Sequence, residues 1–219
     1  AVGPPAGIVD VWHVWLDAPG FPHDLLVLPL DAWERRRAER MRVGGPEWSS
    51  AHGARRVILA SYLNQPAAAV RFAAGGSGKP RLAGVPGLEF SFARTRGLAL
   101  LAVASDREVG VDVERENEFT DIDLVASEFL PPGDKAALEW IEPERRRSAF
   151  FTAWARHEAR LKLYGQGLGG HTPARLRDPA VPVVVRALAP RPGFAAAVAA
   201  EGGGWTVRTR EFTPALCEA

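Results

Sequence analysis

Residues 150–168 read Phe-Phe-Thr-Ala-Trp-Ala-Arg-His-Glu-Ala-Arg-Leu-Lys-Leu-Tyr-Gly-Gln-Gly-Leu. The large apolar side chains of this stretch recur at helical spacing, namely Phe150, Phe151, Trp154, Leu161 and Tyr164. The spacing predicts an amphipathic helix, and the glycines at 165 and 167 suit its C-terminal cap. Pro143 suits the first turn at the other end.

One charged residue lies on the apolar stripe of this helix. Glu158 follows Trp154 by four residues and Phe151 by seven, so its carboxylate is expected on the inward face. A buried carboxylate is costly unless its charge is compensated. Lys162, one turn later, could compensate it as an ordinary helix ion pair. A metal ion or a cationic ligand is the alternative.

A second acidic stretch precedes this helix by about forty residues. Residues 109–114 read Val-Gly-Val-Asp-Val-Glu, after the apolar run 98–104 and a short turn. In a strand the three valines point one way, and Gly110, Asp112 and Glu114 point the other. Two carboxylates on one face repel each other unless a cation lies between them. Their oxygens suit Mg²⁺, which binds a few carboxylates together with substrate phosphate oxygens.

Together, Gly110-Val-Asp-Val-Glu114 and Trp154-Ala-Arg-His-Glu-Ala-Arg-Leu-Lys162 resemble the signature of the 4'-phosphopantetheinyl transferases. That family shows Gly-Val/Ile-Asp-hydrophobic-Glu and then Trp-X-X-Lys-Glu-Ala-X-X-Lys. Its Gly-Lys-Pro motif is matched by Gly78-Lys79-Pro80, and its Asn-hydrophobic-Ser-His-Ser segment aligns with Ser91-Phe-Ala-Arg-Thr95. The resemblance covers roughly residues 30–170, and the chain length fits the surfactin-type, monomeric branch best.

The resemblance implies an α+β fold of two similar lobes related by a pseudo-two-fold axis, residues 1–105 and 106–219. It implies transfer of 4'-phosphopantetheine from coenzyme A to a serine of an acyl or peptidyl carrier protein in polyketide or nonribosomal peptide biosynthesis. The implied Mg²⁺ ligands are Asp112, Glu114 and Glu158. The implied catalytic residues are Glu158, Asp112, His157 and Lys162, and those implied to bind coenzyme A are Arg55, Lys79, Arg94, Thr95 and Lys162. Arg56 is an alternative to Arg55.

Two positions depart from the family pattern. His157 stands where the family has lysine, and Arg94 stands where it has histidine. An unperturbed histidine is mostly neutral at pH 7, whereas arginine remains a competent phosphate ligand. Two further hypotheses therefore stand beside the transferase: the same fold used for another biosynthetic reaction, and a non-catalytic protein that binds a carrier protein.

Composition sets wider limits. The chain has 219 residues, 47% of them hydrophobic, a net charge of +1 and one cysteine, Cys217. The hydrophobic content predicts a globular protein, and the low net charge argues against a nucleic-acid binder. A single cysteine cannot form an intrachain disulfide, and no run is long enough to span a membrane, so a cytoplasmic protein is expected.

The remaining patterns predict further elements. Asp31 suits the N-cap of a charged helix, whose mixed charges indicate a solvated face, and residues 51–63 predict a second helix after a break at Gly44-Gly-Pro46. Residues 8–16, 70–73, 88–92, 97–104, 181–188 and 205–212 predict strands, and 124–129 and 134–141 short helices. The run from Gly97 is echoed ninety-six residues later from Gly193, which agrees with two similar lobes.

Overall fold

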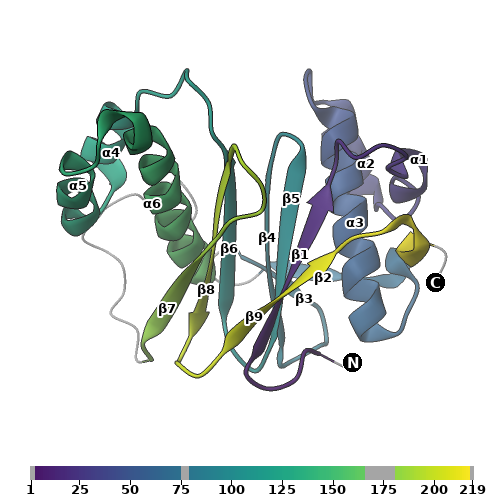
Figure 1. The fold of residues 1–219 in the computed structure, drawn as a ribbon. Helices are drawn as coiled ribbons and strands as arrows, with labels where there is room; N and C mark the ends of the chain where they lie inside the picture. Colours follow the sequence, from purple (N-terminus) through teal and green to yellow (C-terminus); the bar gives the residue numbers. More distant parts are fainter. Residues whose placement is uncertain (1–2, 75–78, 166–180, 218–219) are drawn as a thin grey trace.

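The computed structural model describes residues 3–74, 79–165 and 181–217 (Figure 1). The first half of the chain forms β1 (Ile8–Trp15), α1 (His23–Leu26), α2 (Ala32–Glu39), α3 (Gly45–Leu63), η1 (Ala67–Ala69), β2 (Phe72–Ala74), β3 (Pro80–Leu82), β4 (Leu88–Thr95) and β5 (Leu98–Ser105). The second half forms β6 (Val109–Arg115), α4 (Ile122–Phe129), α5 (Pro132–Glu139), α6 (Pro143–Leu163), β7 (Val183–Leu188), β8 (Phe194–Glu201), β9 (Thr206–Glu211) and η4 (Pro214–Cys217). The predicted α+β class is confirmed.

The strands form two main sheets. A four-stranded sheet has the order β4-β5-β1-β9, and a three-stranded sheet has the order β6-β8-β7. β2 and β3 form a separate antiparallel pair. β9 pairs in parallel with β1, so the last strand of the chain completes the sheet of the first half. The boundary near residue 105 and the pseudo-two-fold axis stay predictions.

The layers follow from which side chains each strand buries. α3 packs on one face of the four-stranded sheet, where Ile58 and Leu59 meet Phe90 and Leu101. The opposite face packs against the valines of β6. α6 covers the outer face of the three-stranded sheet, where Ala155 and Ala159 meet small residues of β8. The two sheets thus lie between α3 and α6 (Figure 1).

The predicted alternation along β6 is confirmed. Val109, Val111 and Val113 are buried toward the four-stranded sheet. Gly110 faces α6 so closely that a Cβ there would overlap the carbonyl oxygen of Ala159. Asp112, two residues later, lies on the same face of β6. The hydrogen bond that its carboxylate accepts from Lys162 of α6 shows this orientation. β6 therefore directs its acidic side chains toward the helix predicted to carry Glu158.

The central helix begins at Pro143, as its sequence predicts, and ends at Leu163. Gly165 follows with a φ of 70°, a left-handed conformation that glycine adopts without a steric penalty. The rest of the stretch that predicted helix, residues 166–168, lies outside the described residues. Buried positions along α6 include Glu158 and His157 beside the phenylalanines, so the inward face is partly polar.

Two expectations for the first half need correction. α3 begins at Gly45 rather than at residue 51, because Pro46 occupies the first turn, where its fixed φ suits a helix. Asp31 caps α2 as predicted, in a capping box with Glu34. The helix is not solvated all round, however, because Glu34 is 2% exposed.

Candidate active site

Asp112 lies at the contact between β6 and α6. Its side chain is buried, and one carboxylate oxygen, Oδ1, accepts a hydrogen bond from the Lys162 ammonium. The other oxygen, Oδ2, is buried and has no hydrogen-bond partner among the described residues. Burial raises the pKa of Asp112, and the Lys162 ammonium opposes that shift. A single lysine therefore compensates only part of the free-energy cost of burying this carboxylate.

Glu114 and Glu158 extend the buried acidic group. Burial raises the pKa of Glu114 to about 7, and the negative charge of Asp112 adds to the shift. Burial and Asp112 likewise raise the pKa of Glu158 to about 7. Lys162 acts in the opposite direction on both, as does the Trp154 indole on Glu114. We call Asp112, Glu114 and Glu158 the acidic cluster.

The chemistry of the acidic cluster suits a hard divalent cation. Its donors are carboxylate oxygens, burial and then the charge of Asp112 raise the pKa values of Glu114 and Glu158, and Asp112 Oδ2 has no partner among the described residues. In the part of the chain that the structure describes, no group of three or more His, Cys, Asp or Glu side chains is close enough to hold a metal ion. The three-carboxylate magnesium site therefore stays a prediction.

Arg55 and Arg56 lie inside the first half of the fold. Arg56 is 1% exposed, and its guanidinium donates to Glu34 at 2.7 Å, to Asp31 at 2.9 Å and to the carbonyl of Val70 at 2.8 Å. Arg55 donates to Glu34 at 2.8 Å, and its guanidinium carbon lies 4.3 Å from the centre of the Phe72 ring. Burial lowers the pKa of Arg55 to about 10. These contacts hold α2 on α3, and they do not support Arg55 as a coenzyme A ligand.

Arg94 and Thr95 end β4, beside the strand that carries the acidic pair. The Thr95 hydroxyl accepts from the backbone nitrogen of Arg115 at 3.3 Å, and Ser91 accepts from Val111 at 3.0 Å. These bonds link β4 to β6 and so connect the two sheets. Arg94 is half-buried. Burial lowers its pKa.

His52 lies near these arginines, and sequence patterns gave no signal for it. Its ring stacks on Trp48 with centroids 3.6 Å apart, and it is 5.2 Å from Phe92 of β4. Burial, then the charges of Arg55 and Arg94, lower its pKa to about 2. The imidazole is therefore neutral at physiological pH. The sequence analysis also did not predict that Glu34 is buried. The adjacent Arg55 and Arg56 on α3, and the position of Glu34 in a capping box, could have indicated it.

Lys79 and His157 complete the set of predicted site residues. Lys79 is 7% exposed, and its ammonium donates to Glu108 and to the carbonyl of Val109, each at 2.7 Å. These contacts give no support to a role in binding coenzyme A. His157 is buried beside Glu158 on α6, with its ring centroid 6.1 Å from that of Trp154. The structure thus brings Asp112, Glu114, Glu158 and Lys162 together and leaves Arg55, Lys79 and Arg94 outside that group.

The acidic cluster, with Lys162 beside it, lies between a strand and a helix of an α+β fold. The family model of the 4'-phosphopantetheinyl transferase superfamily matches residues 108–192, which include β6 and α6. The chain is 31% identical over 214 residues to the 4'-phosphopantetheinyl transferase HetI of Nostoc sp., covering 90% of this chain and 89% of that protein.

Two further relatives carry related names. A putative 4'-phosphopantetheinyl transferase of Synechocystis sp. is 29% identical over 163 residues, covering 74% of this chain and 66% of that protein. The 4'-phosphopantetheinyl transferase AcpT of Salmonella typhi is 30% identical over 91 residues, covering 42% and 47%. The chain belongs to the 4'-phosphopantetheinyl transferase superfamily, which confirms the enzyme class predicted from its motifs. No helix in residues 3–74, 79–165 and 181–217 is long and apolar enough to cross a membrane.

Proposed function

We propose that this enzyme transfers the 4'-phosphopantetheine group of coenzyme A to a serine of an acyl or peptidyl carrier protein, with Mg²⁺ as cofactor. The serine oxygen forms a bond to the phosphorus that carries the pantetheine arm. The pyrophosphate bond breaks, and 3',5'-ADP leaves with the electron pair of that bond. The proton of the serine hydroxyl must be accepted by a base.

One observation carries the proposal: β6 turns Asp112 and Glu114 toward the face of α6 that carries Glu158 and Lys162. Phosphoryl transfer requires that the reacting phosphates be held in place and that their negative charge be neutralised. It also needs a base whose pKa lies near the working pH. The buried carboxylate of Glu158 supports a role as that base.

Each residue of the site then has a role. Asp112, Glu114 and Glu158 would hold Mg²⁺, which would neutralise charge on the pyrophosphate when bound. Glu158 would accept the serine proton. Lys162 would leave Asp112 and contact a phosphate of coenzyme A, since a lysine ammonium on a flexible stem can change partners. His157 would supply positive charge near the phosphates in its protonated form, and Arg94 and Thr95 would bind coenzyme A. The protein would act as a monomer.

The proposal is tested with a panel of apo acyl and peptidyl carrier proteins. Each carrier is incubated with the enzyme, coenzyme A and Mg²⁺, and intact mass is measured together with released 3',5'-ADP. The proposal predicts a carrier that gains one phosphopantetheine group per serine, with equal release of 3',5'-ADP. Binding of coenzyme A with no transfer to any carrier would instead favour a repurposed site, for which the departures His157 and Arg94 are the motive.

A further inference from the structure

The backbones of β6 and α6 approach each other closely at Gly110. A Cβ on Gly110 would overlap the Ala159 carbonyl oxygen, and it would lie 2.5 Å from the backbone nitrogen of Leu163 and 2.9 Å from its Cα. This contact brings the last turn of α6 against the start of β6. Because Asp112 and Lys162 are each within two residues of it, a small shift of either element would change their separation.

Lys79 bridges the same junction from a distant part of the chain. Its ammonium donates to Glu108 Oε2 at 2.7 Å, to the carbonyl of Val109 at 2.7 Å and to the carbonyl of Leu163 at 3.4 Å. Val109 is the first residue of β6, and Leu163 is the last of α6. A carbonyl at a helix C-terminus has no partner within its own helix and favours a cation. Three acceptors use all three N–H donors of the ammonium.

The surroundings fix the ammonium in this position. The second oxygen of Glu108 accepts a hydrogen bond from Arg81, whose guanidinium also donates to Glu89 at 2.8 Å. The Lys79 side chain is only 6% exposed, whereas that of Arg81 is 43% exposed. Each N–H donor of the Lys79 ammonium therefore has an acceptor within the protein.

We propose that Lys79 is a positioning residue, which holds the C-terminal end of α6 on the start of β6 and so keeps Asp112 opposite Lys162. The inference rests on the proposed function of the acidic cluster and adds a residue to it. It replaces the role in coenzyme A binding that the Gly-Lys-Pro motif implied, because the ammonium has no donor left for a phosphate in this arrangement.

Two variants separate the two roles. Lys79→Met removes the charge at similar length, and Lys79→Arg keeps it in a wider, planar group. A positioning residue predicts that both variants bind coenzyme A within twofold of the parent, measured by calorimetry without Mg²⁺. It also predicts that both lose at least tenfold in the rate of a single turnover at saturating coenzyme A. A phosphate ligand predicts at least a tenfold loss of coenzyme A affinity in Lys79→Met and normal behaviour of Lys79→Arg, since arginine binds phosphate well.

Two more measurements distinguish a positioning role of Lys79 from a general loss of stability. Hydrogen exchange should speed up at residues 159–165 and 109–112 in Lys79→Met and remain unchanged elsewhere. In an Asp112→Asn background, Lys79→Met should slow transfer no further, because positioning acts through Asp112. The control is Arg71→Met, which removes an exposed cation whose hydrogen bonds go to the carbonyls of Ala68 and Val70; it should match the parent in exchange and transfer.

The outcomes are decisive in each case. Unchanged exchange at the junction, or a tenfold loss of coenzyme A affinity in Lys79→Met, overturns the inference. If Lys79→Met does not fold, Lys79→Arg decides by the same readouts. If the parent enzyme transfers to no carrier protein, the proposed function fails, and hydrogen exchange with coenzyme A binding still decides whether Lys79 holds the junction or binds the ligand.

Discussion

Replacing Lys162 with methionine should alter three properties of the protein in different directions. Lys162 pairs with Asp112, and their side chains are 31% and 4% exposed. A hydrogen bond between charged groups contributes about 1.5–3 kcal/mol. Because the lysine is nearly one-third exposed, solvent screens part of this interaction, so we expect about 1–2 kcal/mol. The free energy of unfolding without Mg²⁺ should fall by that amount, measured in urea at pH 8.

The same change should strengthen Mg²⁺ binding. If Mg²⁺ and the Lys162 ammonium compete for Asp112, Mg²⁺ must displace the ammonium to bind. Removing the ammonium then makes the free energy of Mg²⁺ binding more favourable by about 1–2 kcal/mol, roughly a 5- to 30-fold gain in affinity. Coenzyme A should bind more weakly, by about 1–3 kcal/mol, if Lys162 contacts a phosphate. Calorimetry measures the affinity for Mg²⁺ and then the affinity for coenzyme A. Both titrations are made at pH 8, where Glu114 and Glu158 are mostly ionised.

The matched control is Arg156→Met, which removes an exposed cation from the same helix. It should leave all three quantities within about 0.5 kcal/mol of the parent, as surface substitutions usually do. If Lys162→Met reduces stability but changes neither Mg²⁺ nor coenzyme A affinity, the lysine is only a structural partner of Asp112. The proposed exchange of partners during binding would then be refuted.

Three further predictions concern buried and motif residues. Glu34→Gln should lower the free energy of unfolding by about 3–5 kcal/mol in urea, because the buried guanidinium of Arg55 loses its counter-charge and that of Arg56 keeps only the exposed Asp31; a loss below about 1 kcal/mol would contradict this. Raised pKa values near 7 at Glu114 and Glu158 make the folded protein bind more protons than the unfolded chain, so stability without Mg²⁺ should fall as pH rises from about 4.5 to 7. Urea titrations should show a shallower fall in Glu158→Gln, and an identical slope would exclude Glu158 as a contributor. His157→Lys should raise the transfer rate and flatten its decline at alkaline pH, because lysine stays charged there; a lysine variant that binds both substrates but transfers nothing would show that the histidine is not what limits the reaction.

The elements that carry the acidic cluster were predictable because their patterns are local. Strict alternation in residues 109–114 placed Asp112 and Glu114 on one face, and helical spacing placed Glu158 on the inward face of α6. Asp31 was recognisable as a cap because capping depends on a few neighbouring residues.

The remaining features depend on contacts between distant segments. Glu34 resembles its charged, solvated neighbours in sequence, and only the packing of α2 on α3 buries it against Arg55 and Arg56. The place of β9 beside β1 joins the two ends of the chain. Lys79 carries a motif that implies ligand binding, yet its ammonium is occupied by groups up to 84 residues away in sequence. Local periodicity gives no information on such partners.

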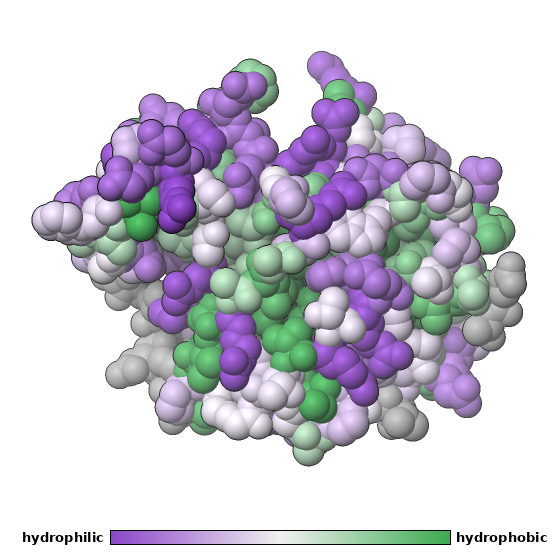
Figure 2. Space-filling view, in the orientation of Figure 1, coloured by the Kyte–Doolittle hydropathy of each residue, from purple (hydrophilic) through white to green (hydrophobic). Residues whose placement is uncertain are grey.

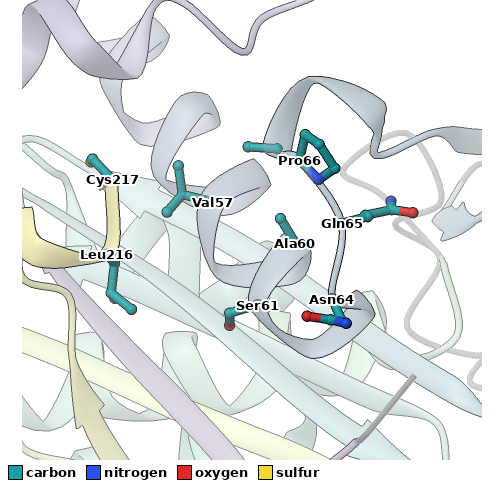
Figure 3. A pocket seen from close by; sticks show the side chains of 9 residues that line it. Val57, Ala60, Ser61, Asn64, Gln65, Pro66, Leu216 and Cys217 are labelled. Atoms are coloured by element: carbon teal, nitrogen blue, oxygen red, sulfur yellow. The ribbon is translucent and has the colours of Figure 1, made fainter. Parts of the chain in front are cut away.

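The surface has two further features. A cavity of about 680 Å³ lies between the end of α3 and η4, lined by Val57, Ala60, Ser61, Asn64 and Leu216 among others (Figure 3). On the face shown in Figure 2, hydrophobic residues gather in the middle and hydrophilic residues along the upper part. None of the residues that line the cavity belongs to β6 or α6.

The most direct test of the acidic cluster is single-turnover transfer to an apo carrier protein by Glu158→Gln and Glu144→Gln. Both replace a carboxylate of α6 by its amide, but Glu158 is 5% exposed within the cluster and Glu144 is exposed in the first turn. Loss of a general base typically costs 10²- to 10⁴-fold in rate. The account predicts a loss of about that size for Glu158→Gln, with coenzyme A still bound, and a parental rate for Glu144→Gln. Equal transfer rates in both variants would contradict it.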